Sequence, residues 1–213
     1  MGTIKGGVLG GFSGKVGAVV GSHWKGKAVM RGKSTAKKAK SSALQLEQQA
    51  KFTLMVKFLQ AIVDFLNFSY KKAAVQMSGF NKAISTNIQF AIAGVYPDFA
   101  VDFPKVQLSK GSLPHIALPT AASTVAGKVD FTWTDNSKVT QGALSSDMVY
   151  VAAYNEEQKH WIINDAAAAR NAGTFILDVT GYSGKLLHTY IGLLSADGKK
   201  ASTSIYTGAV TVL

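Results

Sequence analysis

The sequence predicts an α+β protein in which an N-terminal β-hairpin arm and a two-helix hairpin precede a seven-stranded immunoglobulin- or fibronectin type III-like β-sandwich. Residues 1–34 hold 10 of the 21 glycines, apolar residues then recur at helical spacing, and the pattern alternates with period 2 beyond residue 96. We therefore expect a basic glycine-rich arm and hinge at 1–40, a helical hairpin at 41–95 and a sandwich domain at 96–213, with its core at 110–213.

The glycine-rich start predicts a β-hairpin followed by a basic hinge, KSTAKKAK, at residues 33–40. Lys15–Val20 and Lys25–Arg31 are expected to form two short strands around a turn at Gly21–Trp24. A glycine-dense segment becomes ordered only when close packing or pairing offsets its backbone entropy. Because a two-stranded hairpin is marginally stable alone, we expect the arm to lie on the helices, on the sandwich or on another subunit.

The next segment predicts two helices packed as a hairpin. Ser42 and Gln45 fit a capping box, from which a long helix should run to about Phe68. A second helix is expected over residues 80–93, with Gly94 as its left-handed C-cap. We interpret the apolar stripe of the first helix as core rather than as a binding groove. Its members are Leu44, Phe52, Met55, Phe58, Leu59, Ile62, Phe65 and Leu66.

The C-terminal half alternates apolar and polar residues in segments that have the spacing of a β-sandwich. Val129, Phe131 and Trp133 should face inward on the second strand, and Tyr190 should face the core or a corner on the sixth. Asp197–Gly198 marks the last hairpin turn. The seven expected strands cover residues 114–118, 127–134, 147–154, 159–164, 173–179, 186–195 and 202–212.

The net positive charge is confined to one part of the chain. Residues 1–72 contain thirteen basic and two acidic residues, which accounts for the whole net charge of +11, whereas residues 73–213 contain ten of each. A localised field attracts polyanions or acidic surfaces more strongly than the same charge spread evenly. The residues expected to bind a polyanion are Lys15, Lys25, Lys27, Arg31, Lys33, Lys37, Lys38 and Lys40.

Three classes of function stay open. The first is a non-enzymatic structural protein that self-assembles into a homo-oligomer or polymer, its arm docking onto neighbouring copies by strand addition. The second is sequence-tolerant binding of nucleic acid or another polyanion by the same arm, with Phe12 and Trp24 stacking on bases; we favour instead that both fill the apolar side of the hairpin. The third, a surface- or carbohydrate-binding module, rests on the fold alone. The assembly arm residues are Phe12, Lys15, Val19, Trp24 and Met30.

No catalytic residue, metal site or cofactor is expected. The chain has no cysteine, which excludes disulfides and thiolate chemistry. Its four histidines lie far apart, and none has a second histidine or carboxylate at metal-ligand spacing. Gly14–Lys15 does not fit a nucleotide-binding loop, because the preceding glycine frame and the following Ser or Thr are both missing. The protein is therefore predicted not to be an enzyme.

No segment has the pattern of a signal peptide, because glycines and lysines interrupt every apolar run near the N-terminus. The longest apolar stretch, residues 52–68, is interrupted by Lys57, Gln60, Asp64 and Asn67 and has fewer apolar residues than a membrane span requires. We expect a soluble protein without a membrane span. Cytoplasmic synthesis is favoured, with later release as part of an assembly left open.

Several segments resemble those of a family of Bacteroidota proteins that is classed as a domain of unknown function. The resemblance runs over essentially the whole chain and implies that arm, helices and sandwich form one recurrent unit. It implies no catalytic residues. The matching segments are GGFSGKVGAVVGSHWKGKAVMR at 10–31, QQAKF at 48–52, FNKAIS at 80–85, Gly94 with YPDF at 96–99, SKGSL at 109–113, FTWTDNS at 131–137, DMVYVAAYN at 147–155 and ARNAGTF at 169–175.

Overall fold

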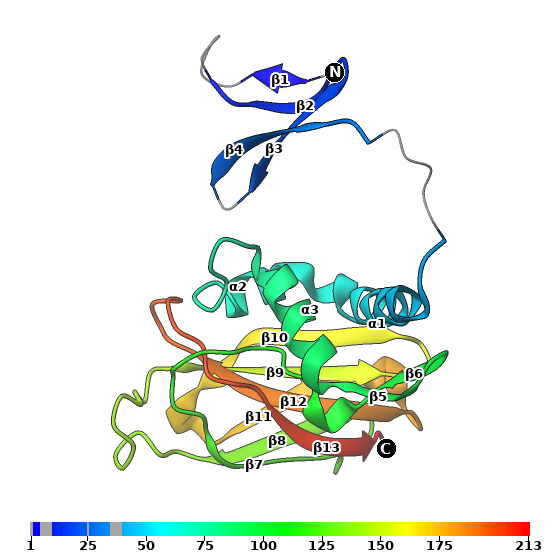
Figure 1. Cartoon of the computed structure of the whole chain (residues 1–213). Helices are drawn as coiled ribbons and strands as arrows, with labels where there is room; N and C mark the ends of the chain where they lie inside the picture. The colour runs from blue at the N-terminus through cyan, green and yellow to red at the C-terminus, as the bar shows by residue number, and fades with distance from the viewer. Residues whose placement is uncertain (1, 5–9, 25, 35–39) are drawn as a thin grey trace. The chain divides into compact units, whose positions relative to one another are not determined.

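Figure 1 shows the computed structural model, which describes residues 2–4, 10–24, 26–34 and 40–213. The chain divides into two compact units, Met1–Ser42 and Ala43–Leu213. We call the first unit the N-terminal sheet and the second unit the body, and each is described by itself. The helices and the sandwich, which the sequence separates at residues 95 and 96, belong to the same unit.

The N-terminal sheet contains four antiparallel strands in the order β1-β2-β3-β4. Gly17 and Gly26, which lie in the turns before β3 and β4, have φ angles of 57° and 80°. Glycine adopts such angles without the steric penalty that a side chain would bring. The strands are β1 (Thr3–Ile4), β2 (Phe12–Val16), β3 (Val19–Trp24) and β4 (Lys27–Gly32).

The predicted two-stranded hairpin is wrong in its strand number and in its turn. Gly21–Trp24, expected as the turn, forms the last four residues of β3, and the expected first strand, Lys15–Val20, contains the real turn at Gly17. Gly21 is buried beneath Phe12: a Cβ atom at this position would collide with the backbone oxygen and the ring of Phe12. This glycine therefore serves close packing inside the sheet rather than a turn.

The first predicted helix is confirmed. It consists of α1 (Ala43–Leu59), a 3-10 turn (Gln60–Ile62) and α2 (Val63–Ser69), which follow one another without a break. The stripe interpretation is only partly right. Its members from Met55 onward are buried or half-buried, whereas Leu44 and Phe52, which both precede Met55 on α1, are exposed.

The second predicted helix corresponds to α3 (Gly79–Phe90). The Ser78 hydroxyl caps its start by accepting a hydrogen bond from the Asn81 N–H at 3.2 Å. Gly94 is not its C-cap, because the helix already ends at Ala91 and the chain turns into a small hairpin of β5 (Ile92–Val95) and β6 (Asp98–Val101). The turn of this hairpin contains the cis peptide bond between Tyr96 and Pro97.

Seven strands of the body form two sheets, β11-β8-β7 and β10-β9-β12-β13, whose strand order is that of an immunoglobulin-like sandwich. The α+β class and the sandwich are confirmed, and each expected sandwich strand overlaps an observed one. The predicted total number of strands is wrong, because a four-stranded N-terminal sheet and the β5–β6 hairpin were not expected. The strands are β7 (Ala117–Ala122), β8 (Lys128–Thr134), β9 (Met148–Asn155), β10 (His160–Ala169), β11 (Thr174–Asp178), β12 (Leu186–Leu194) and β13 (Ile205–Thr211).

The interior of the sandwich contains the predicted inward-facing residues. Val129, Phe131 and Trp133 are all buried, and they pack with Val151 of β9 and Ile191 of β12. The turn between β12 and β13 contains Gly198 with a φ angle of 66°, as the Asp-Gly pair predicted. The period-2 pattern therefore identifies this core correctly.

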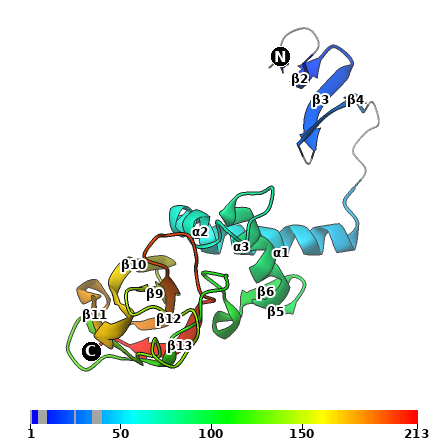
Figure 2. The same cartoon turned by 90° about the vertical axis from the view of Figure 1, so that its left-hand side faces the viewer.

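The helices cover the outer face of the four-stranded sheet, so the body has three layers (Figure 2). Trp161 of β10 packs against Phe58 of α1 with ring centroids 5.1 Å apart, and its indole N–H donates to the Phe58 carbonyl oxygen at 2.9 Å. Tyr190 is buried as predicted, on the helix side of the sheet, where its hydroxyl donates to the Phe103 carbonyl oxygen. Because both faces of β9 and β12 are covered, nearly every residue of these strands is buried.

The helical stretch Ala43–Ser69 is long and apolar enough to cross a membrane when judged by length and composition alone. Its second half contributes to the core of the body, where Met55, Leu59 and Leu66 are fully buried. A core helix of this kind meets the same criteria as a membrane span, so the stretch is weak evidence for one. The absence of a membrane span stays a prediction.

Candidate functional site

The pairing of strands assigns each residue of the N-terminal sheet to one of its two faces. Residues directly opposite each other on antiparallel strands point to the same side, and successive residues on one strand point to opposite sides. Lys15 of β2 pairs with Val20 of β3, which pairs with Arg31 of β4, and Trp24 pairs with Lys27. We call this side the basic face, and its residues are Lys15, Val20, Ser22, Trp24, Lys27, Val29 and Arg31.

The basic face exposes three cationic side chains and one large aromatic. Lys15, Lys27 and Arg31 are all exposed, and 63% of the Trp24 surface is accessible. Residues 1–42 contain nine basic residues and no acidic residue, so no carboxylate side chain within this unit neutralises the face. Burial therefore does not account for the position of Trp24, and the prediction that it fills the apolar side of the hairpin is wrong.

The opposite side of the sheet is apolar, and we call it the apolar face. The ring of Phe12 lies over Gly21 and is half-buried, as the sequence predicted for this residue. Met30 of β4 is 71% exposed, and Val16 is also exposed. The apolar face comprises Phe12, Gly14, Val16, Val19, Gly21, Ala28 and Met30, together with the exposed His23.

The structure divides the predicted assembly residues between these faces. Phe12, Val19 and Met30 lie on the apolar face, whereas Lys15 and Trp24 lie on the basic face. The sequence groups these residues without assigning faces, because the face of each residue depends on the strand register. The two-residue turn at Gly17, between the paired residues Val16 and Val19, was the signal that could have corrected the register.

The predicted polyanion-binding residues are brought together only in part. Lys15, Lys27 and Arg31 share the basic face. Lys33 and Lys40 are exposed beyond the strands, and the backbone N–H of Lys33 donates to the Ala18 carbonyl oxygen at 2.7 Å. The remaining three, Lys25, Lys37 and Lys38, lie outside the described residues.

Strand β4 forms an edge of the N-terminal sheet. It pairs with β3, and all six of its residues, Lys27–Gly32, are exposed. An edge strand presents backbone N–H and C=O groups to whatever lies beside it, so it can serve as a template for a further strand. This edge was not identified from the sequence, because the expected hairpin gave no strand order beyond two strands.

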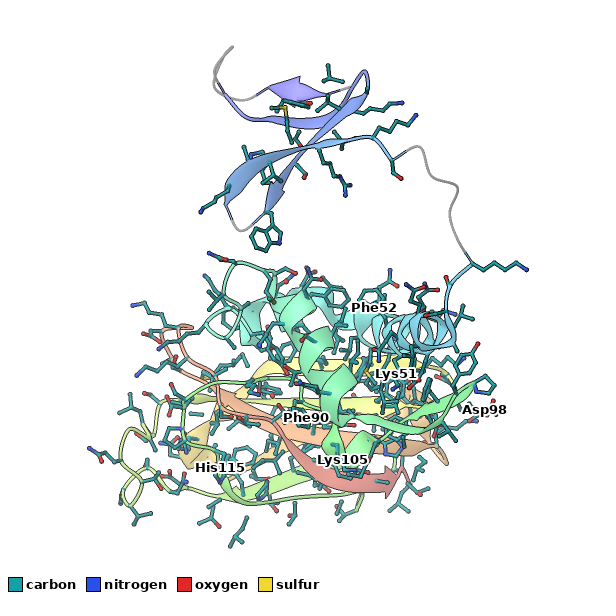
Figure 3. All side chains as sticks on the ribbon, in the orientation of Figure 1. Lys51, Phe52, Phe90, Asp98, Lys105 and His115 are labelled. Carbon is teal, nitrogen blue, oxygen red and sulfur yellow. The ribbon has the colours of Figure 1, made fainter. Side chains whose placement is uncertain are left out.

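The body carries an apolar groove between α1 and α3. Phe52, Ile84 and Ile88 contribute its apolar surface, Asn81 and Gln89 contribute amide groups, and its volume is about 540 Å³. Phe52 is 52% exposed, and it is labelled in Figure 3 on α1. Phe52 is the one residue of the predicted apolar stripe that lines this groove, and the other lining residues belong to α3.

The ionisable groups of the body with strongly raised pKa values have structural roles. Burial raises the pKa of Tyr70, Tyr150 and Tyr190. Tyr70 donates to the Gln107 carbonyl oxygen at 2.9 Å, and Tyr150 shares a hydrogen bond of 2.5 Å with Ser109. Tyr150 and Tyr190 tie the segment between the helices and the sandwich to the sheet, and Tyr70 ties it to the end of α2. All three hydroxyls stay protonated at neutral pH.

The histidines and carboxylates do not gather into a metal site within the described part of the chain. His160 lies beside Tyr182, with 2.5 Å between its Nδ1 and the tyrosine oxygen, and His188 lies 3.0 Å from the Tyr206 hydroxyl. Arg170 and Asp147, which are both fully buried, form an ion pair of 3.0 Å. Arg170 also donates to the Pro114 carbonyl oxygen at 2.9 Å. Breaking such a buried pair would leave an uncompensated charge, so the pair fixes the loops at this end of the sandwich.

The model of a family of unknown function, DUF6266, matches residues 11–208, which include β2–β4 of the N-terminal sheet and almost all of the body. The chain belongs to this family. The match spans both compact units, so sheet and body occur together in the family's definition. The search of curated proteins found no match to this chain.

Two solved structures similar to this member of DUF6266 contain fibronectin type III domains. One is the fibronectin type III domain of the human collagen alpha-1(XX) chain, with 10% sequence identity and a TM-score of 0.35, which covers 49% of this chain and 90% of that domain. The other is the FN1–FN3 segment of chicken CNTN1, with 12% identity and a TM-score of 0.36, covering 48% of this chain and 35% of that one. The strand order of the two sheets, β11-β8-β7 and β10-β9-β12-β13, identifies the sandwich as immunoglobulin-like.

Proposed function

We propose that this chain is a non-enzymatic structural protein that self-assembles, and that the N-terminal sheet joins neighbouring copies through strand β4. The observation that carries the proposal is the exposure of all six residues of this edge strand. Strand addition satisfies backbone hydrogen-bonding groups along the whole edge at once. The partner that fits best is a second copy of the same strand.

The small size of the N-terminal sheet also supports this proposal. Among its described residues only Gly21 is buried, so the sheet encloses very little apolar surface of its own. Sheets need several strands and a covered apolar face for independent stability. Pairing two copies along β4 would extend the sheet and join their apolar faces, each of which exposes Met30.

The register of this pairing has an electrostatic consequence. An antiparallel register centred on Val29 keeps the two apolar faces on one side and pairs most of the length of β4. Lys27 then lies opposite Arg31 of the second copy, and like charges in such positions repel each other. Salt screens this repulsion, so assembly should become stronger as ionic strength rises.

Light scattering coupled to size-exclusion chromatography tests the proposal on the full chain. We expect a mass above that of the monomer, increasing with protein concentration and with salt. Met30→Lys places a charge in the joined apolar face and should yield monomer. Met77→Lys is the matched control, because Met77 is 49% exposed in the body and should leave the mass unchanged.

A wild-type protein that stays monomeric at high concentration and high salt would overturn the proposal. The same holds if Met30→Lys and Met77→Lys assemble equally well, or if deletion of residues 1–34 leaves the mass per particle at the same multiple of the chain. Circular dichroism on both methionine variants checks that the body remains folded, so that loss of assembly is not mistaken for unfolding of the body.

A further inference from the structure

We propose that the basic face of the N-terminal sheet binds single-stranded nucleic acid, with Trp24 stacking on a base and the cations of the face holding the phosphates. This site is a face of the sheet, whereas the assembly proposed above uses the β4 edge. The inference rests on the strand register, which places Lys15, Lys27 and Arg31 on the same side as Trp24.

The spacing of the cations suits an extended polyanion. Lys15 and Arg31 lie in one row two strands apart, which corresponds to about 10 Å, and Lys27 lies four residues before Arg31, or about 13 Å along β4. All three side chains are exposed. The three charges therefore cover an area rather than a point, so they can contact several phosphates of one strand.

Trp24 distinguishes a nucleic acid from other polyanions. The two remaining tryptophans of the chain, Trp133 and Trp161, are each 6% exposed, whereas Trp24 is 63% exposed beside Lys27. A large aromatic that stays accessible next to cations provides the stacking surface that single-stranded bases use, and stacking tolerates any base. Heparin and polyphosphate have no bases and gain nothing from this surface.

A single strand fits better than a duplex. The face is a sheet surface whose cations and tryptophan lie together, and the bases of a duplex are stacked on one another and are not available to Trp24. A single strand exposes its bases and its phosphates on the same flexible chain. We therefore infer a ligand such as single-stranded DNA or RNA, bound without sequence preference.

The test is a titration of the full chain with fluorescein-labelled oligothymidine of 20 nucleotides, followed by anisotropy, and with the unlabelled oligomer, followed by tryptophan emission. We expect quenching of the emission on binding. With three phosphates neutralised, the slope of log affinity against log salt should be about −2, so affinity should fall roughly 15- to 20-fold between 50 and 200 mM salt. Trp24→Ala should weaken binding roughly 5- to 150-fold, the range expected for loss of one stacked base.

The cations are tested with two variants that remove equal charge. Lys15→Gln, Lys27→Gln and Arg31→Gln together should abolish measurable binding and the salt dependence. The control combines Lys71→Gln, Lys138→Gln and Lys200→Gln, which change exposed lysines of the body. The control lowers the net charge by the same amount but leaves the basic face intact, so it should bind like the wild type.

Several outcomes would overturn the inference. These are no binding at 50 mM salt, equal losses in the two triple variants, or an unchanged affinity for Trp24→Ala. Heparin or duplex DNA that binds as tightly as the oligomer and quenches to the same extent would also overturn it. Mass measured on the same samples separates the two proposals, because a monomer that binds overturns only the assembly and an assembly that does not bind overturns only this site.

Discussion

The N-terminal sheet and the body use strands in opposite ways. In the body, both faces of β9 and β12 are covered, one by the sandwich interior and the other by the helices. In the N-terminal sheet, β4 is fully exposed and Gly21 is the one buried residue among those described. The body therefore contains the apolar core that holds its fold, whereas the sheet presents most of its surface to partners.

Charge follows the same division. Residues 1–42 contain nine basic and no acidic residues, and residues 43–213 contain fourteen basic and twelve acidic residues. A uniform charge destabilises an isolated compact unit by self-repulsion but attracts a polyanion. A ligand that binds only the folded sheet would also stabilise it by mass action. Weak internal packing and unbalanced charge thus point to the same conclusion, that the sheet is a binding element.

The contrast between core and surface can be tested most strongly inside the body, on two phenylalanines of α1. Phe58 is buried against Tyr154 and Trp161, whereas Phe52 lies in the open groove. Phe58→Ala should lower the free energy of unfolding by about 3–5 kcal/mol, because it removes apolar contacts and leaves a cavity. Phe52→Ala should change it by less than about 1 kcal/mol. Urea unfolding followed by far-UV circular dichroism measures both values. Equal losses would show that the groove is part of the core.

Most of the body could be predicted because its patterns are strong. The alternation of Val129, Phe131 and Trp133 identified a strand with one buried face, and the helical spacing from Met55 to Leu66 identified a packed helix. The β5–β6 hairpin was missed because Gly94 fits a C-cap and a hairpin bulge equally well. The structure decides between these two roles of Gly94, because α3 ends at its C-cap residue Ala91, before Gly94 is reached.

The N-terminal sheet was predicted less well because glycine serves two purposes there. Gly17 and Gly26 have the positive φ angles that turns require, whereas Gly21 makes room for Phe12. A sequence does not separate these two uses of glycine. The turn was therefore predicted at Gly21 instead of Gly17, and the two faces of the sheet were not distinguished. The charged residues were identified correctly as a group, but which of them share a face with Trp24 depends on register.

Packing within the N-terminal sheet depends on the absence of a side chain at Gly21. Gly21→Ala introduces a Cβ atom against the backbone oxygen and ring of Phe12, an overpacking that typically costs about 1–3 kcal/mol. We expect this loss to open the sheet, because the sheet has little buried surface. Gly32→Ala is the control, since a Cβ atom there meets no neighbour within 4 Å. Amide hydrogen exchange of β2–β4 should increase only in Gly21→Ala, while the exchange of β9 and β12 stays unchanged in both. Exchange in β9 rising together with that in β3 would show that the two units unfold as one.

The smallest expected effect is a pH dependence of the stability of the body that originates at His188. Burial lowers the pKa of this imidazole below its ordinary value, while nearby Glu156 acts in the opposite direction. Its ring stacks on Phe103 with centroids 3.7 Å apart, and its Nδ1 lies 3.0 Å from the Tyr206 hydroxyl. The unfolded chain therefore takes up a proton more readily, so stability is constant above about pH 6.5 and decreases as the pH falls through the folded pKa.

The range from pH 7.5 to 5.0 isolates this histidine contribution. The hydrogen bonds accepted by Asp135, Asp178 and Asp197 lower the pKa of these carboxyls, whose contribution is lost only below about pH 3.9. The urea midpoint of the wild type should decrease over this range, and the decrease should be smaller in His188→Gln. His115→Gln, which changes an exposed histidine, should keep the wild-type decrease. An identical decrease in all three proteins would show that His188 is protonated as easily in the folded body as in the unfolded chain, so that the layer between helices and sheet does not exclude water around it.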